Sequence, residues 1–175
     1  MKRIILLGLF FAMPSVADDT SSIDEIIDTY YAVISGPKGH LYDAQRDASI
    51  HAEGALITKF FQDGRFQRHN LVKEQTMITV PYDAGFFEFE VGRRVEHTEN
   101  IAHVWSDFEM RSAPQGEVID RGVNSISLFF RDQRWWISSW STQYTDTVID
   151  TSEATAPAQL TELDTDQFAE VVKTI

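Results

Sequence analysis

The sequence predicts an α+β fold in which a curved antiparallel sheet wraps around three helices and leaves a pocket between the two layers. Segments with helical periodicity come early in the chain and strand-like segments come late, an order typical of α+β domains rather than of alternating βαβ units. The late segments 101–111, 121–130 and 134–141 are rich in β-branched and aromatic residues. Short breaks, APQGEV and RDQ, separate them and favour antiparallel neighbours over crossover connections.

Three segments have the features of helices. In 22–34 the apolar residues recur at three- and four-residue spacing, with Ser21 or Ser22 as the N-cap and Gly36 following the end. We expect a second helix from about 43 to 51. A third is expected from about 71 to 80, because Pro81 cannot continue it.

Two further segments are predicted to be strands. Residues 53–61 read as the first strand, and a turn at 62–64 allows 65–67 to pair back briefly. The segment 86–99 begins the main sheet. Its alternation predicts Phe87, Phe89 and Val91 on a buried face, with Glu88 and Glu90 in water. Gly92 indicates a bulge or bend in this strand.

The first 17 residues are typical of a cleavable signal peptide. Lys2 and Arg3 precede an apolar run at 4–13, and the segment Ser15-Val16-Ala17 matches the small-x-small pattern of a cleavage site. Ten apolar residues are too few to span a bilayer, which needs about 20, although a retained membrane anchor is the alternative. We therefore expect a mature chain that begins near Asp18, is periplasmic or secreted, and has no membrane contact after cleavage.

Composition limits the partners and the chemistry. The chain has 175 residues, enough for one domain at 18–145, and no cysteine, which excludes thiol nucleophiles and thiolate metal sites. Its net charge is −12; without Lys2 and Arg3 it has 13 basic against 27 acidic residues, or −14. Such a charge repels nucleic acids and anionic lipids.

Residues 146–175 form an acidic tail after the domain. A short helix is expected near 161–174. The two alternatives for this segment are that it docks on the edge of the sheet or that it is unstructured.

The sheet segments resemble a known superfamily. GFFEFEVGRRVEHTENIAHVWSDFEMR and RGVNSISLFFRDQRWWISSWS are similar to the nuclear transport factor 2-like superfamily, and most of all to its SnoaL-like and ketosteroid-isomerase-like bacterial members. The likeness covers roughly 22–143. It implies a cystatin-like cone, a sheet closed by three helices around a cavity, and a homodimer formed through the outer face of the sheet. The superfamily includes isomerases, dehydratases, hydrolases, ligand binders and interaction modules, and no catalytic motif matches here, so no catalytic residue is carried over.

Strand parity divides the candidate site residues. In 101–111 the even positions are apolar and should face the helices, which places His103 and Trp105 on the other face. A position at an interface or on the surface is therefore favoured for His103 over a position in the pocket. Asn124 shares a face with apolar neighbours, so it either orients a ligand or bonds nearby groups. In the last strand Trp136 and Trp140 are expected on one face and Trp135 and Ile137 on the other.

Helices supply the remaining candidates. One of Tyr30 and Tyr31 should face the cavity, and His51 lies where such pockets open, although an exposed helix-end histidine is the plainer interpretation. Asp47 and Asp83 are the best carboxylate candidates for acid–base chemistry. The predicted ligand-binding residues are Tyr31, His51, His103, Asn124, Trp136 and Trp140.

The function favoured by the sequence is binding of a small, partly apolar molecule without turnover. The alternatives are a lyase, isomerase or hydrolase that uses a pocket histidine or carboxylate, and a protein-interaction module. No cofactor is predicted. His97 and His103 do not form a recognisable ligand pattern, because 98–100 reads as a turn between them, so no metal site is predicted.

Overall fold

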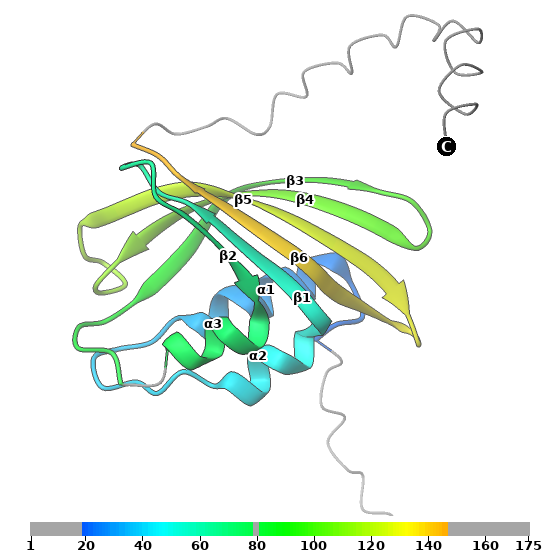
Figure 1. The fold of residues 1–175 in the computed structure, drawn as a ribbon, viewed down its shortest axis with the longest axis horizontal. Helices are drawn as coiled ribbons and strands as arrows, with labels where there is room; N and C mark the ends of the chain where they lie inside the picture. The colour runs from blue at the N-terminus through cyan, green and yellow to red at the C-terminus, as the bar shows by residue number, and fades with distance from the viewer. Residues whose placement is uncertain (1–18, 79–80, 147–175) are drawn as a thin grey trace, which may run out of the picture.

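Three helices cover one side of a six-stranded sheet in the computed structural model, which describes residues 19–78 and 81–146 (Figure 1). This arrangement confirms the predicted α+β class. The predicted signal peptide and nearly all of the predicted acidic tail lie outside the described residues. The elements in chain order are α1 (Ile23–Ile34), α2 (Ala44–Ile50), β1 (His51–Phe60), β2 (Phe66–Asn70), α3 (Leu71–Met77), β3 (Phe87–His97), β4 (Ile101–Arg111), β5 (Val118–Arg131) and β6 (Arg134–Tyr144).

The strands follow the order β2-β1-β6-β5-β4-β3 across the sheet. Consecutive strands joined by short turns, from β3 to β6, pair antiparallel as predicted. The prediction of a wholly antiparallel sheet is wrong for one pair, because β1 lies parallel to β6. A long excursion through β2, α3 and three strands separates these two, so no hairpin dictates their relative direction.

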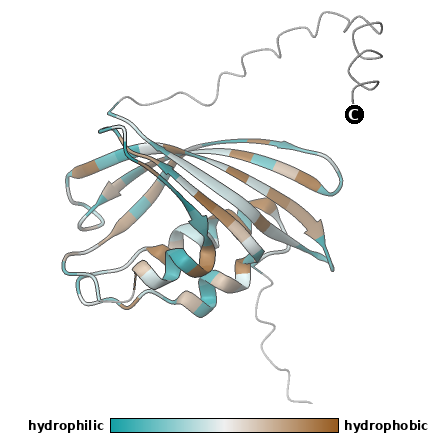
Figure 2. Cartoon of the chain, viewed as in Figure 1, coloured by the Kyte–Doolittle hydropathy of each residue, from teal (hydrophilic) through white to brown (hydrophobic). Residues whose placement is uncertain are grey.

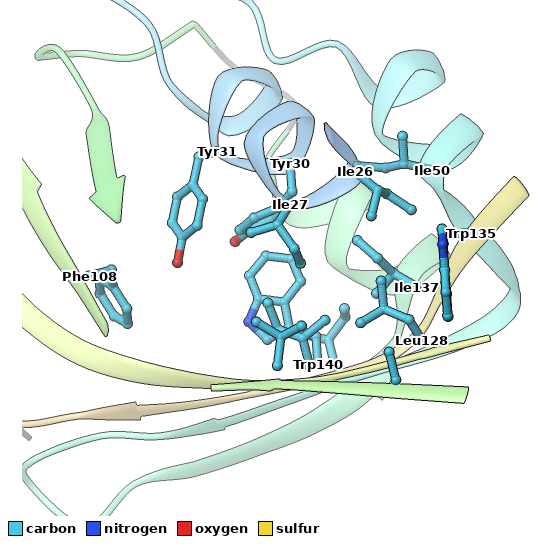
Figure 3. Close-up of a cluster of buried hydrophobic side chains, with 14 residues drawn as sticks. Ile26, Ile27, Tyr30, Tyr31, Ile50, Phe108, Leu128, Trp135, Ile137 and Trp140 are labelled. Atoms are coloured by element: carbon cyan, nitrogen blue, oxygen red, sulfur yellow. The ribbon is translucent and has the colours of Figure 1, made fainter. Parts of the chain in front are cut away.

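Helix α1 forms where the sequence pattern places it. The side chain of Ser22 accepts a hydrogen bond from the backbone N–H of Glu25 at 3.2 Å and so caps the first turn. The apolar face packs on the sheet, where Ile26 and Ile27 are fully buried against strand residues of the hydrophobic core (Figure 3). None of the helices among the described residues is both long and apolar enough to cross a bilayer.

The inner face of the sheet is set by β4 and β5. Val104, Phe108, Ile126 and Leu128 are almost completely buried, which confirms the predicted parity of both strands. Hydrophobic residues accordingly alternate with hydrophilic ones along the strands (Figure 2). The helices lie on this inner face, and the space between the two layers contains the candidate site.

The parity predicted for β3 is wrong. Glu88 is buried, whereas Phe89 and Val91 are 36% and 54% exposed. The reason is the register with β4: Glu88 lies opposite Met110, an even position of that strand, and so shares its inward face. A register shift between Glu90 and Gly92 confirms the predicted bulge.

A second bulge corrects the prediction for β6. The register shifts between the pairs Ile137–Leu128 and Ser139–Ser127, so Ser138 is an extra residue on the β6 side. One extra residue reverses the alternation. Ile137 and Trp140 therefore face the helices together with Trp135, as Figure 3 shows. Trp136 is not part of that core.

Candidate ligand-binding cavity

A cavity of about 350 Å³ lies between the helices and the inner face of the sheet. This volume is within the range of small-molecule sites, about 300–1,000 Å³. All three helices and strands β1, β3 and β6 contribute to its wall. Among the described residues, six aromatic ones line it: Tyr30, Tyr42, Tyr82, Phe86, Trp140 and Tyr144.

His51 occupies the junction of α2 and β1 and lines the cavity. Its Nδ1 lies 2.8 Å from the backbone oxygen of Asp47, and because a carbonyl oxygen only accepts, Nδ1 carries the proton. The ring plane is parallel to that of Trp140, with the two centroids 6.1 Å apart. The Nε2 atom is buried and has no hydrogen-bond partner among the described residues. In the neutral ring this atom is an acceptor left for a bound molecule.

Glu88 of β3 adds a buried carboxyl to the same wall. Burial raises its pKa to about 7, although a hydrogen bond from Asn124 and the charge of Lys59 act in the opposite direction. The Nδ2 of Asn124 donates to Oε1 at 3.3 Å. Among the described residues Oε2 receives no hydrogen bond, so this oxygen is the one available to a molecule in the cavity.

Asn124 is held in one orientation by its own partners. Trp140 Nε1 and Thr142 Oγ1 donate to its Oδ1 at 3.0 and 2.7 Å. The Nδ2 must therefore face Glu88 and the hydroxyl of Tyr31, which lies 3.2 Å away. Every donor and acceptor of this amide is used, so Asn124 is a support for Glu88 rather than a ligand contact.

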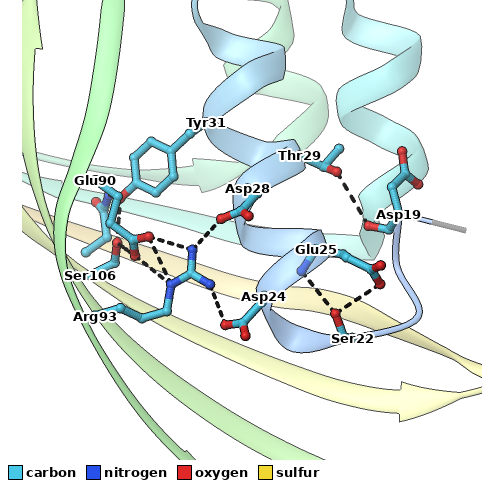
Figure 4. A network of polar contacts seen from close by, with 11 residues as sticks. Asp19, Ser22, Asp24, Glu25, Asp28, Thr29, Tyr31, Glu90, Arg93 and Ser106 are labelled. Carbon is cyan, nitrogen blue, oxygen red and sulfur yellow. Dashed lines mark hydrogen bonds and ion pairs between the residues drawn. The ribbon is translucent and has the colours of Figure 1, made fainter. Parts of the chain in front are cut away.

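The support extends from the cavity to the surface (Figure 4). The hydroxyl of Tyr31 lies 2.6 Å from Ser106 Oγ, and Ser106 donates to the carboxylate of Glu90. Arg93 binds the same carboxylate and also reaches Asp24 and Asp28 on α1. This network connects α1 to β3 and β4, and so fixes the strand that carries Glu88.

The other end of the cavity wall carries an ion cluster. Glu74 of α3 pairs with Lys59 of β1 and with His69 of β2. Burial acts to raise the pKa of Glu74, but Lys59 and His69 outweigh it and lower the pKa below its usual range. Within 19–78 and 81–146 no three side chains are grouped in a way that could hold a metal ion.

The structure separates the six predicted ligand-binding residues into three groups. His51 and Trp140 line the cavity. Tyr31 and Asn124 lie in the layer behind the wall and act through their hydrogen bonds. His103 and Trp136 do not line the cavity.

The two misplaced residues have other surroundings. His103 lies on the outer face of the sheet, as its parity predicts, and its Nε2 is 2.9 Å from Ser125 Oγ. Trp136 lines a second hollow of about 590 Å³, which shares His51 and Leu71 with the cavity wall. Of the carboxylate candidates, Asp47 lines the cavity beside His51, whereas Asp83 is exposed.

Sequence reasoning missed several polar residues of the wall, among them Glu74, Glu88, Lys59 and Tyr42. Glu88 was hidden by the alternation FEFEV, which assigns phenylalanines to the core. Lys59 shares the inward parity of Ala55 and Ile57, and this parity was the available signal. Tyr42 precedes α2, and its hydroxyl donates to the Asp47 carboxylate, a contact that no local pattern indicates.

Comparisons with known proteins support the fold alone. Neither a protein-family profile nor a curated protein matches this chain. A protein of unknown function with a cystatin-like fold from Nostoc punctiforme aligns over 72% of this chain and 90% of its own, with TM-score 0.56 and 8% identity.

Two further solved structures agree with that likeness. An NTF-2 like protein of unknown function from Silicibacter pomeroyi covers 70% of this chain and 92% of its own, with TM-score 0.51 and 14% identity. A function-unknown protein from Mycobacterium tuberculosis covers 79% and 78%, with TM-score 0.53 and 17% identity. Together with the sheet order and the three helices, these neighbours identify the fold of this chain as the nuclear transport factor 2-like, cystatin-like fold.

Proposed function

We propose that this protein binds a small, partly apolar molecule in the cavity between the helices and the sheet. The observation that carries the proposal is the Nε2 of His51, a buried acceptor without a partner among the described residues. A buried polar atom without a hydrogen bond costs roughly 1–3 kcal/mol, and a ligand that donates to it recovers that cost. Aromatic side chains around it supply the apolar contact.

The test compares two histidine variants. A set of ring compounds of up to two rings is screened by thermal shift against the wild type, His51→Phe and His103→Phe. Loss of the hydrogen bond to Nε2 should weaken the compounds that bind the wild type by about 10-fold in His51→Phe. His103→Phe is the matched control, because it replaces a histidine on the opposite face of the sheet. Equal effects of the two variants would contradict binding in the cavity.

Proton-transfer catalysis is the second candidate, and the raised pKa of Glu88 favours it. A carboxyl with a pKa of about 7 exchanges protons readily near neutral pH, and the His51 imidazole lies in the same wall. In this scheme Nε2 of His51 accepts a proton from the bound molecule and protonated Glu88 donates one to it. Deuterium incorporation into a bound compound in D₂O, lost in Glu88→Gln, would support catalysis. Its absence for every bound compound favours binding alone.

Export and dimerisation belong to the same proposal. The outer sheet face carries the exposed side chains of Leu56 and Phe60, and further along it the half-buried pair His103 and Trp105. Aromatic residues are enriched at protein interfaces, which supports a homodimer through this face. Sedimentation equilibrium of the chain from Asp18 tests the dimer, and a monomer up to 100 µM or so would contradict it.

A further inference from the structure

The hydrogen-bonding groups of the cavity wall are unevenly used. Several of its donors are used within the protein: Tyr42 donates to Asp47, Tyr82 to the Ile34 carbonyl, and Trp140 to Asn124. The ammonium group of Lys59 is paired with Glu74. His51 Nε2 is buried and has no partner among the described residues. The one side-chain hydrogen bond to the Glu88 carboxyl among them goes to Oε1, which leaves Oε2 as a second acceptor, and the hydroxyls of Tyr30 and Tyr144 can both donate and accept. The cavity therefore favours a ligand that donates hydrogen bonds.

The charges of the wall point the same way. Of the described residues, the carboxylic acids Asp47, Glu74 and Glu88 line the cavity, against one basic residue with a permanent charge, Lys59. Lys59 forms its ion pair with Glu74, and no basic side chain of the described residues forms an ion pair with Glu88, although the charge of Lys59 lowers the Glu88 pKa. A net charge of −12 on the chain also steers cations towards the protein.

Aromatic rings complete the arrangement. Six of them line the cavity, and the face of an aromatic ring attracts an organic cation within about 6 Å of its centroid. A cavity of about 150 Å³ holds benzene. The present volume of about 350 Å³ has room for one or two rings with a short side chain.

We propose that the ligand is an organic ammonium ion carrying one or two rings, whose N–H groups donate to His51 Nε2 and to the Glu88 carboxylate. This inference rests on the proposed binding function and specifies the ligand class. The cation supplies the counter-charge that Glu88 lacks, and its ring contacts the aromatic wall.

The surroundings of Glu88 agree with this assignment. Lys59 from β1, Asp120 from β5, and the phenols of Tyr30, Tyr31 and Tyr144 are the titratable groups that act on it or respond to it. Burial raises the pKa of Glu88 to about 7, so its ionised form is disfavoured in the empty cavity. A bound cation favours that form.

Three indole probes of similar size test the charge preference by isothermal titration calorimetry. Tryptamine carries an ammonium group, tryptophol a hydroxyl and indole-3-acetate a carboxylate. At pH 8 we expect tryptamine to bind about 10- to 100-fold more tightly than tryptophol, because a hydrogen bond between charged groups exceeds a neutral one. Glu88→Gln should remove this preference. Glu96→Gln is the matched control, because Glu96 lies opposite His103 in the register of β3 and β4 and its side chain is 61% exposed.

Each remaining outcome counts against the ammonium ligand. Tryptophol or indole-3-acetate binding as tightly as tryptamine would overturn it, and so would a preference for tryptamine that survives in Glu88→Gln. If tryptophol binds and His51→Phe weakens it, the cavity binds small molecules but not by charge, and the proposed function stands alone. If no probe binds, the ammonium inference fails, and the wider screen with His51→Phe decides the proposed function.

Discussion

Glu88 and Glu74 line the same cavity, yet their pKa values are displaced in opposite directions. Burial acts to raise both. Lys59 and His69 pair with Glu74 and bring its pKa below the usual range. Glu88 has no ion pair among the described residues, and the hydrogen bond from Asn124 and the charge of Lys59 do not outweigh its burial. The difference teaches that a nearby cation, rather than burial alone, decides the charge of a carboxyl in this wall.

This contrast separates a structural carboxyl from a functional one. Glu74 is compensated within the chain and connects α3 to β1 and β2. Glu88 is supported in position by a fully used amide but forms no ion pair among the described residues. A group held in place at an energetic cost is a candidate for ligand contact.

The largest effect is expected from removing the support of Glu88. Asn124→Ala leaves the buried groups of Trp140, Thr142 and Tyr31 without their partner and opens a small cavity. We expect a loss of about 4 kcal/mol in the free energy of unfolding, measured by urea denaturation at pH 7. Ser125→Ala, which removes one hydrogen bond on the outer face, should cost about 1 kcal/mol or less. Similar losses in the two variants would contradict the role of Asn124.

Breaking the ion pair between Lys59 and Glu74 should reduce the free energy of unfolding somewhat less. Lys59→Met leaves Glu74 half-paired in the wall, and we expect a loss of about 3 kcal/mol. The double variant Lys59→Met/Glu74→Leu should regain most of it, because no unpaired charge remains. A double-mutant cycle by urea denaturation measures the coupling. A double variant as unstable as Lys59→Met would show that the pair is not the cause.

The smallest expected effect is on the pH dependence of the free energy of unfolding, to which Glu88 and Glu74 contribute with opposite signs. The pKa of Glu88 rises from 4.5 to about 7 on folding, so the folded state binds its proton more tightly and stability falls as the pH rises across this range. Glu88→Gln removes this loss, and we expect it to stabilise the protein at pH 8 by about 2 kcal/mol and to have no such effect at pH 4. Glu74 has the opposite sign, because its lowered pKa stabilises the fold above the unfolded value. A Glu88→Gln variant that is less stable at pH 8 would contradict the account.

Much of the fold could be predicted because local patterns fix it. The spacing in α1, its Ser22 cap and the even face of β4 follow from residues close in sequence. The parities of β3 and β6 could not be predicted, because the pairing with β4 fixes the first and an extra residue at Ser138 reverses the second.

The site could be predicted only in part for the same reason. His51 and Trp140 were identified from their residue types and positions. Glu88 was assigned to water because a glutamate between phenylalanines reads as an exposed residue. Its burial follows from the register with β4, and its hydrogen bond comes from Asn124, 36 residues away in the chain. Long-range hydrogen bonds of this kind leave no periodic signal in the sequence.

The most direct test of the account is the pKa of Glu88, measured through its side-chain carboxyl carbon by NMR with and without saturating tryptamine. We expect a value near 7 in the free protein and, with tryptamine bound, one at or below the ordinary glutamate value of about 4.3. A pKa near 4.3 in the free protein, or a pKa that bound tryptamine leaves unchanged, would contradict the claim that Glu88 lacks an ion-pair partner and binds a cationic ligand.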